Sequence, residues 1–452
     1  MYSSATDHVT ELVQLVRGST AREIAASLEA AIRQGALGPG ASLPSVRQLA
    51  THLRVSPPTV AAALADLRRR GVVVTHERRR SSVSPRPPLT VDAADTLLPP
   101  NVVDLARGNP DPELLPDLRP LLAQLAEAPR QEHGYGDAPV DARLVELARR
   151  ELSEAGVEPE DIALASGALD GVERALAAHL APGDRVIVED PGYFAVFDLL
   201  RAMGLEAVPA AIDDRGLNLS ALTTALRSGA RALVLTPRAH NPTGAAMDYV
   251  HSVALRGILE NSPDVLVVED DHQGPISGAP GRTLTRGRAH WAVVRSVAKS
   301  LGPDLRLAFV AGDAETIARV EGRLALGPGW VSHLLQSVVI QLLESTEVRE
   351  QLRRAEAIYA RRRIALLHAL AEHGVPATGR SGFNVWVPVP DEASVANRLL
   401  HAGWAVGLGA RYRIASPPAI RITCAALPEA DASRLAAAVA QAFQPVRRAR
   451  VA

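Results

Sequence analysis

Four short apolar runs constrain the fold of this chain more than any other feature of its sequence. They read DRVIVEDPG (184–192), ARALVLTPR (230–238), DVLVVEDD (264–271) and LRLAFVAG (305–312), and amphipathic segments separate them. Strands without polar alternation are buried on both faces, which is typical of a mostly parallel sheet covered by helices. From about residue 102 onward, the sequence therefore predicts an α/β domain.

Polar residues follow these runs and the segment AVVRSVA (292–298). In an open α/β sheet, ligands bind beside the carboxyl ends of the strands. Residues that follow different strands are therefore expected to meet at one site. This set comprises Asp190, Tyr193, Asn241, Asp270, His272 and Lys299.

Lys299 is the single lysine among the 49 lysine and arginine residues of the chain. On a solvated surface, either residue supplies a positive charge. A buried lysine amine, however, can lose its proton and attack a carbonyl, whereas a guanidinium stays charged. The retained lysine indicates imine chemistry. The alternative is a chance survivor on the surface, and composition alone does not decide between the two.

The residue types around Lys299 match what pyridoxal 5′-phosphate (PLP) requires. A carboxylate such as Asp270 can keep the pyridine nitrogen protonated, so that the ring withdraws electrons. The segment ASGALDGVERAL (165–176) is expected to begin a helix, whose amino end attracts a phosphate. Ser296 and Arg306 flank the lysine, and they add a hydroxyl group and a charged guanidinium group that can bind a phosphate. The helix start contributes Ser166, Gly167 and Ala168. No metal site is predicted.

The first 90 residues differ in charge from the rest of the chain. They hold 12 arginines and 6 acidic residues, a net charge of +6, whereas the remainder carries −7, which gives −1 for the whole chain. Helical spacing in TAREIAASLEAAI (20–32) and two further short helices precede VVVTHERRRSSVSP (72–85), which alternates like a hairpin with a basic tip. This pattern is typical of a winged helix-turn-helix that binds DNA.

The segment LPSVRQLATHLRVSPPTVAAALADLRRRG (43–71) resembles the GntR family of bacterial transcription regulators. The resemblance implies DNA contacts, mostly to phosphates, from the helix-turn-helix and the wing. A small helical docking domain is the alternative. The residues implied are Ser45, Arg47, Ser56, Thr59, Arg78, Arg79 and Arg80.

The larger part of the chain resembles a fold-type I aminotransferase. Seven segments carry this resemblance in the correct order: YGDAPVDARLVELARREL, SGALDGVERAL, EDPGY, NPTG, VVEDDH, SVAKSLGPDLR and IRITCA. Together with the GntR-like N-terminal region, the whole chain resembles the MocR subfamily of GntR-type regulators. The resemblance implies a mostly parallel sheet and a smaller C-terminal α+β subdomain. We expect a DNA-binding domain over 1–83, a proline-rich linker over 84–101 and a PLP-binding effector domain over 102–445.

The resemblance also implies roles for individual residues. Lys299 forms a Schiff base, the internal aldimine, with PLP, and Asp270 pairs with the pyridine nitrogen. Asn241 bonds the ring O3′, and His272 stands where the family has a tyrosine that shares this bond. Tyr193 lies against the ring, and Arg421 receives the carboxylate of an amino-acid-like effector. Tyr135 reaches the phosphate of the partner subunit. The phosphate within the same subunit is held by Gly167, Ala168, Ser296 and Arg306.

These features predict a PLP-dependent transcription regulator that binds a double-stranded DNA operator. It is expected to be a homodimer that senses PLP itself or an amino compound through an aldimine at Lys299. The linker is long enough for the DNA-binding heads to be swapped between subunits. An active aminotransferase with a regulatory or vestigial head is the alternative, and residual transamination stays open. A scaffold without cofactor is disfavoured by the retention of Lys299.

The expected location is the cytoplasm, without a membrane partner. Cys424 is the single cysteine, which excludes an intramolecular disulfide and fits a reducing compartment. No apolar run reaches membrane-spanning length, and the N-terminus lacks the pattern of a signal peptide.

Overall fold

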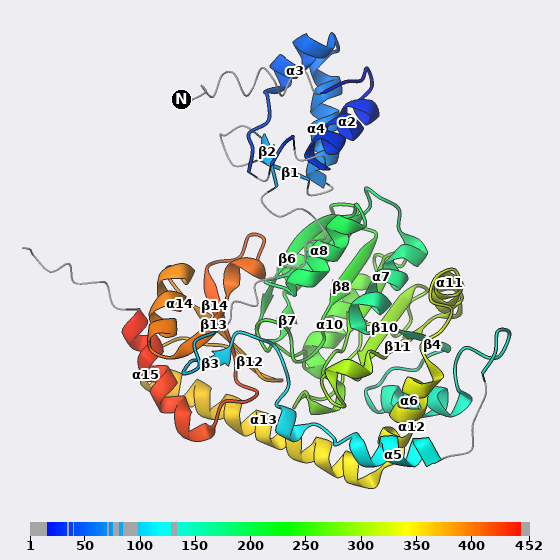
Figure 1. Cartoon of the computed structure of the whole chain (residues 1–452), viewed down its shortest axis with the longest axis vertical. Coiled ribbons are helices and arrows are strands. Elements are labelled where there is room, and N and C mark those ends of the chain that lie inside the picture. Colours follow the sequence, from blue (N-terminus) through cyan, green and yellow to red (C-terminus); the bar gives the residue numbers. More distant parts are fainter. Residues whose placement is uncertain are drawn as a thin grey trace, which may run out of the picture. The chain divides into compact units, whose positions relative to one another are not determined.

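The computed structural model of the chain consists of a small head and a larger body, each with its own hydrophobic core (Figure 1). The tip of the predicted wing (76–80) and most of the predicted linker (85–97) lie outside the described residues. Those residues are 16–33, 36–38, 40–69, 72–75, 81–84, 98–127 and 133–443.

In its described residues, the head has three helices and a hairpin. The helices are α2 (Ala21–Arg33), α3 (Val46–Leu53) and α4 (Pro57–Arg69), and the antiparallel strands are β1 (Val73–Thr75) and β2 (Ser81–Val83). All three helices and both strands contribute buried side chains to one core. The arrangement confirms the winged helix-turn-helix predicted from the sequence.

The two helices of the helix-turn-helix begin at serine N-caps. The Ser45 hydroxyl accepts a hydrogen bond from the Gln48 amide at 3.2 Å, and the Gln48 side chain accepts one from the Ser45 amide at 2.9 Å. This reciprocal capping box satisfies two otherwise free amides of α3. Ser56 caps α4 without this reciprocal bond: its hydroxyl accepts a hydrogen bond from the Thr59 amide at 3.3 Å.

An eight-stranded sheet forms the centre of the body, in the order β4-β11-β10-β9-β8-β5-β6-β7. The neighbours β5, β8, β9 and β10 run parallel, whereas β11 is antiparallel to both β10 and β4. The four apolar runs of the sequence correspond to β5, β8, β9 and β11. The bounds are β4 (Asp161–Ala165), β5 (Arg185–Asp190), β6 (Glu206–Asp213), β7 (Gly216–Leu217), β8 (Ala232–Leu235), β9 (Leu266–Asp270), β10 (Trp291–Ser296) and β11 (Ala308–Gly312).

Helix α7 (Ala168–His179) packs on one face of this sheet, against β4, β9, β10 and β11. At Gly171 the helix approaches so closely that a Cβ atom would lie 2.9 Å from a methyl group of Val294 and 3.0 Å from one of Val310. Val294 is paired in register with Asp270. Because paired residues of neighbouring strands project from the same face, Asp270 projects toward the α7 side.

The opposite face is covered by α9 (Leu219–Leu226) and α10 (Tyr249–Leu259). Their buried leucines share a cluster with Leu233 of β8 and Val267 of β9. Helices on both faces explain why the central strands lack polar alternation. The other body helices are α5 (Arg119–Glu127), α6 (Ala142–Glu154), α8 (Phe194–Ala202), α11 (Ala314–Ala325), α12 (His333–Glu344), α13 (Thr346–Glu372), α14 (Glu392–His401) and α15 (Ala432–Ala442).

A four-stranded sheet in the order β12-β14-β13-β3 forms the smaller part of the body. Strands β12 (Asn384–Pro388), β13 (Trp404–Leu408) and β14 (Ala419–Thr423) come from the C-terminal region, as the predicted α+β subdomain requires. Its fourth strand, β3 (Val103–Leu105), comes from the start of the body and runs parallel to β13. Strand β3 was not predicted from the sequence, because three residues are too few to show a pattern.

Helix α13 is 27 residues long and connects the two parts of the body. It contacts α12 in the larger part of the body, and β12 and α15 in the smaller part. Figure 1 shows the helix running past both parts. Among the described residues, no helix is long and apolar enough to cross a membrane.

The Asp190 carboxylate joins the end of β5 to the segment that precedes β14. It accepts hydrogen bonds from the amides of Ile414 at 2.9 Å, Ala415 at 2.7 Å and Ser416 at 3.0 Å, and from the Ser416 hydroxyl at 2.9 Å. Asp190 was expected to belong to the ligand site. Its buried carboxylate is instead engaged in holding this segment in place.

We predict that Asp190→Ala destabilises the protein by about 2 kcal/mol, because hydrogen bonds to a charged acceptor are lost together. The urea midpoint of unfolding measures the change. Glu429→Ala is the matched control, since it removes an exposed ion pair with Arg361 and is expected to cost less than about 1 kcal/mol. Equal midpoints for the two variants would contradict the assigned role of Asp190.

Candidate cofactor site at the edge of the large sheet

The antiparallel strand β11 determines which residues meet at one edge of the large sheet. Ala308, the first residue of β11, pairs with Ala165 at the end of β4 and with Ser296 at the end of β10. The start of β11 therefore lies beside the carboxyl ends of its two neighbours. This register brings Ser166 and Arg306 close to Ser296, as the predicted phosphate site requires.

The amino end of α7 lies directly against the Arg306 guanidinium. Arg306 donates a hydrogen bond through Nη2 to the carbonyl oxygen of Ser166 at 2.9 Å. Gly167, the N-cap of α7, has a φ of +106°, and a Cβ atom there would lie only 2.6 Å from Nη2 of Arg306. The backbone conformation favours glycine at this position, and the guanidinium occupies the space beside it.

Not every predicted phosphate-binding group is available to a ligand. The Ser166 amide already donates to Asp170 Oδ2 at 2.8 Å. The buried Ser296 hydroxyl accepts from the Ala298 amide at 3.1 Å, which leaves its own hydrogen to donate. The first amides of a helix have no partner within that helix. The amides of Gly167 and Ala168, together with Arg306, thus form the anion-attracting part of the site.

Lys299 follows β10 in a turn and is partly buried. Its amine donates a hydrogen bond to the carbonyl oxygen of Gly108. Burial, followed by the positive charge of Arg421, lowers the pKa of Lys299 to about 8, while the charge of Asp270 opposes the change. The amine is therefore easier to deprotonate than that of an ordinary lysine, and Lys299 is no chance survivor on the surface.

Two adjacent carboxylates at the end of β9 have opposite environments. Asp271 is held by Arg238, at 3.0 and 2.8 Å, and by Arg295, at 2.6 Å, and these cations keep its pKa well below the usual range despite burial. Asp270 is 5% exposed, and no hydrogen bond reaches its Oδ1 from any residue that the structure describes. Burial, followed by the charges of Asp271 and Glu189, raises the pKa of Asp270 to about 7.

Arg421 of β14 is buried, with an exposed fraction of 3%. Its Nη1 donates to Oδ1 of Asn241 at 2.9 Å, and its Nη2 donates to the carbonyl oxygen of Ala106. The guanidinium carbon lies 4.8 Å from the centre of the Tyr412 ring. The structure therefore places two predicted residues, Asn241 and Arg421, in direct contact, and Arg421 is not an ordinary surface arginine.

Tyr193 and His272 are both partly buried. The Tyr193 ring meets Phe194 edge to face, with ring centres 5.1 Å apart, and burial followed by the Asp270 charge raises the pKa of its hydroxyl. Burial, assisted by the Lys299 charge, lowers the pKa of His272 to about 4. The imidazole is thus neutral at neutral pH and keeps one N–H that can donate.

Tyr135 and the predicted DNA-binding residues are not part of this cluster. Tyr135 is 97% exposed, and its ring lies edge to face against Trp330 with centres 5.6 Å apart. Arg47 is exposed on α3 of the head, where Ser45, Ser56 and Thr59 take part in the helix caps. The predicted wing arginines, Arg78, Arg79 and Arg80, lie outside the described residues.

Sequence reasoning missed several groups that line the site. The carbonyl groups of Ala106 and Gly108, just after β3, bind Arg421 and Lys299. Tyr412 packs under the Arg421 guanidinium. Backbone acceptors leave no trace in residue type, so no signal could have identified the first two. His240, which directly precedes Asn241, was also missed, although its position beside the NPTG segment was a usable signal.

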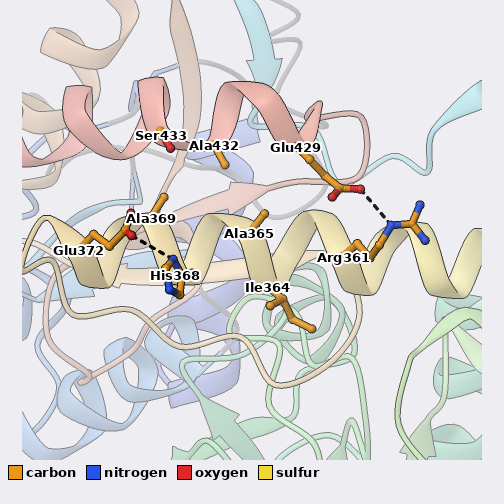
Figure 2. Close-up of a pocket in the computed structure, with 9 residues that line it drawn as sticks. All are labelled: Arg361, Ile364, Ala365, His368, Ala369, Glu372, Glu429, Ala432 and Ser433. Atoms are coloured by element: carbon orange, nitrogen blue, oxygen red, sulfur yellow. Dashed lines mark hydrogen bonds and ion pairs between the residues drawn. The ribbon is translucent and has the colours of Figure 1, made fainter.

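A separate pocket lies between α13 and the start of α15 (Figure 2). Two ion pairs border it, Arg361–Glu429 at 3.1 Å and His368–Glu372 at 3.4 Å. None of its lining residues belongs to the predicted cofactor set. The lining residues are Arg361, Ile364, Ala365, His368, Ala369, Glu372, Glu429, Ala432 and Ser433.

The side chains at the sheet edge fit PLP. The cofactor needs an amine for its aldehyde, a carboxylate for its pyridine nitrogen and anion-binding groups for its phosphate. Lys299 supplies an amine with a lowered pKa, and Asp270 supplies a buried carboxylate whose Oδ1 has no partner among the residues described. The amino end of α7 and Arg306 supply the remaining groups.

Two family descriptions match the chain, one for each part. Residues 20–83 match "Bacterial regulatory proteins, gntR family", and residues 100–439 match "Aminotransferase class I and II". The fold agrees with the second match: a kynurenine aminotransferase of Pyrococcus horikoshii superposes with a TM-score of 0.70, at 22% identity, over 76% of this chain and 91% of that one.

Curated relatives share both parts. The chain is 40% identical to the vitamin B6 salvage pathway transcriptional repressor PtsJ of Salmonella typhimurium, over 95% of this chain and all of that protein. It is 27% identical to the pyridoxine biosynthesis transcriptional regulator PdxR of Corynebacterium glutamicum, over 75% and 76% of the two chains. With a GntR-type DNA-binding domain followed by an aminotransferase-like domain, the chain belongs to the MocR subfamily of GntR-type transcription regulators.

Proposed function

We propose that the protein is a DNA-binding transcription regulator that responds to PLP, or to an amino compound joined to PLP, at Lys299. The observation that carries this proposal is the contrast at the end of β9. Asp271 is fully paired with arginines, whereas the neighbouring Asp270 is buried with an oxygen that has no partner among the described residues. A cationic ring nitrogen at Asp270 would remove this cost.

The proposed site uses the residues already described. Lys299 bonds the cofactor, Asp270 holds the proton of the ring nitrogen, and Tyr193 lies against the ring. Asn241 and the neutral His272 bond the ring oxygen. The phosphate is held by Gly167, Ala168, Ser296 and Arg306. The carbonyl oxygen of Ser166, next to Gly167, accepts a hydrogen bond from Arg306. When bound, PLP supplies an electron-withdrawing ring to whatever amine is joined to it.

Arg421 gives the site a place for an effector carboxylate. Its guanidinium is fixed by Asn241, Ala106 and the Tyr412 ring, so it is oriented before any ligand arrives. An arginine held in this way binds a carboxylate at little entropic cost. An amino acid whose carboxylate lies at Arg421 would present its amino group toward Lys299.

We also propose a homodimer located in the cytoplasm. Tyr135 is almost fully exposed in the single chain, and the nearby start of α12 exposes Leu334. Exposed aromatic and aliphatic side chains are typical of a surface that another subunit covers. A dimer would present two heads to two half-sites of a DNA operator. A ligand shifts the equilibrium between two dimer arrangements only by its difference in affinity for them.

An active aminotransferase is the second candidate, because Lys299, Asp270, Asn241 and Arg421 are assembled in one place. Incubation of the PLP-loaded protein with amino acids and 2-oxo acids tests for turnover. Sustained transfer of the amino group would favour the enzyme, whereas ligand-dependent DNA affinity without turnover would favour the regulator.

We predict that wild-type protein mixed with PLP gains a visible absorbance band that Lys299→Ala lacks. Lys299→Arg is the matched control, because it keeps the positive charge but cannot form the bond. After free PLP is removed by gel filtration, neither variant is expected to show the band. A band of wild-type intensity in either variant would show that PLP attaches elsewhere.

We predict that the rate of PLP attachment increases with pH. Only the neutral amine is nucleophilic, and the pKa of Lys299 is lowered to about 8. The rate should therefore rise up to about tenfold per pH unit below pH 8 and level off above it. Stopped-flow absorbance between pH 6 and 9.5 measures the profile. A rate that still rises steeply at pH 9.5 would mean that the amine has an ordinary pKa.

We predict that Arg47→Ala weakens DNA binding about tenfold and reduces its dependence on salt, because a phosphate contact is lost. Fluorescence anisotropy measures the affinity, with duplexes that the wild-type protein selects from a random pool. Arg143→Ala is the matched control, since Arg143 forms an exposed ion pair with Glu344 in the body. Unchanged affinity for Arg47→Ala would remove this residue from the DNA interface.

A further inference from the structure

Helix α4 is the second helix of the helix-turn-helix, the element that enters the major groove of DNA in this fold. Its sequence, PPTVAAALADLRR, has polar side chains only at Thr59 and in its last four residues. In helices of this kind, the residues near the amino end meet the edges of the bases. The DNA-binding role of the head therefore leaves open what this helix reads.

One face of α4 is buried in the head, where the helix packs against α2 and α3. The buried side chains are Val60, Ala63, Leu64 and Leu67. Residues three or four positions apart share a face of a helix. The opposite face, which is left for DNA, therefore carries only small apolar side chains over three turns: the exposed Pro58 and Ala62 and the half-buried Ala61 and Ala65.

The amino end of α4 also lacks the amides that usually bind a phosphate. Pro57 and Pro58 have no N–H. The amides of Thr59 and Val60 both donate to the carbonyl oxygen of Ser56, at 3.0 and 3.4 Å. The hydroxyls of Ser56 and Thr59 share a hydrogen bond of 2.7 Å, which leaves one hydroxyl hydrogen for a phosphate. In this part of the described chain, the anion site of a helix start is thus absent.

The major groove offers one feature that such a face can recognise. Base pairs differ there in their hydrogen-bond donors, their acceptors and the C5 methyl group of thymine. Alanine and proline side chains cannot bond to a donor or an acceptor, but they can contact the methyl group. The first 90 residues carry a net charge of +6, and Arg47 on α3 and Arg54 after it are exposed. These charges favour DNA phosphates as the surroundings of the apolar face.

We propose that α4 recognises thymine through its C5 methyl group, by apolar contact with Ala62. The surface itself follows from the GntR match and the helix-turn-helix fold, and Ala62 determines what it selects. Ala62 is exposed one turn after Pro58 on the outer face, and its small side chain lets the helix backbone approach the bases. The inference rests on the proposed function, because it concerns the same DNA-binding surface.

The test uses the full chain and an operator duplex that the wild-type protein selects from a random pool. In copies of this duplex, one thymine at a time is replaced by uracil, which keeps every hydrogen-bonding group and lacks only the methyl group. Fluorescence anisotropy measures the affinity. We expect the affinity to fall about fourfold at one or more thymines, since that is the effect of burying a single methyl group.

Ala62→Gly removes the side chain that makes the contact. This variant should bind the thymine and uracil duplexes equally well at the positions that the wild-type protein distinguishes. Ala26→Gly is the matched control, because Ala26 is also exposed on a helix of the head but belongs to α2. The two substitutions have a similar cost in helix propensity, and Ala26→Gly should keep the full difference between the duplexes.

A second variant keeps the test usable if Ala62→Gly does not fold. Ala62→Ser places a hydroxyl against the methyl group. It should weaken binding to the thymine duplex more than binding to the uracil duplex, because a hydroxyl buried against a methyl group loses its bond to water.

The outcomes separate this inference from the proposed function. If the wild-type protein selects no duplex from the pool, the proposed function fails. If it selects an operator but every uracil duplex binds as tightly as the thymine duplex, DNA binding stands and the inference is wrong. A thymine–uracil difference that persists undiminished in Ala62→Gly would assign the methyl contact to another element, which also overturns the inference. Loss of the difference in Ala62→Gly but not in Ala26→Gly would support it.

Discussion

The site depends on one reversal in the large sheet, the antiparallel placement of β11 between β4 and β10. If β11 ran parallel to its neighbours, Arg306 would lie at the opposite edge of the sheet from Ser166 and Ser296. The reversal instead pairs Ala308 with Ala165 and Ser296. It therefore sets a cation over the amino end of α7, where the helix dipole and free amides already favour an anion. The phosphate end of the site is a consequence of strand direction.

Much of this arrangement could be predicted from the sequence. The apolar runs identified β5, β8, β9 and β11, and the rarity of lysine singled out Lys299, because arginine cannot do its chemistry. What could not be predicted depends on tertiary contacts that residue type does not encode. The strand β3 is too short to show a period, and the carbonyl groups of Ala106 and Gly108 bind through the backbone.

The two adjacent aspartates show the same limit at the level of charge. In the sequence, Asp270 and Asp271 are equivalent carboxylates that end one run. In the structure, alternation along β9 and the turn that follows it direct them into different environments. Asp271 meets Arg238 and Arg295, from segments 33 and 24 residues away in the numbering of the chain, and stays ionised. Asp270 receives no cation of that kind, so burial raises its pKa to about 7. The resemblance singled out Asp270, and the folded chain supplies the physical reason for the difference between the two carboxylates.

With an effector carboxylate at Arg421, as proposed, this residue would connect the ligand to the rest of the body. It belongs to the small sheet, yet it donates to Asn241 at the edge of the large one and to Ala106 just after β3. A carboxylate at Arg421 would share the guanidinium with both acceptors, since Nε has no partner among the described residues. Under the proposed function, such binding would act on the contact between the two parts of the body that Asp190 also joins. A ligand shifts a conformational equilibrium only when its contacts differ between the two conformations. Arg421 is therefore the residue through which effector binding would be coupled to a change in domain arrangement.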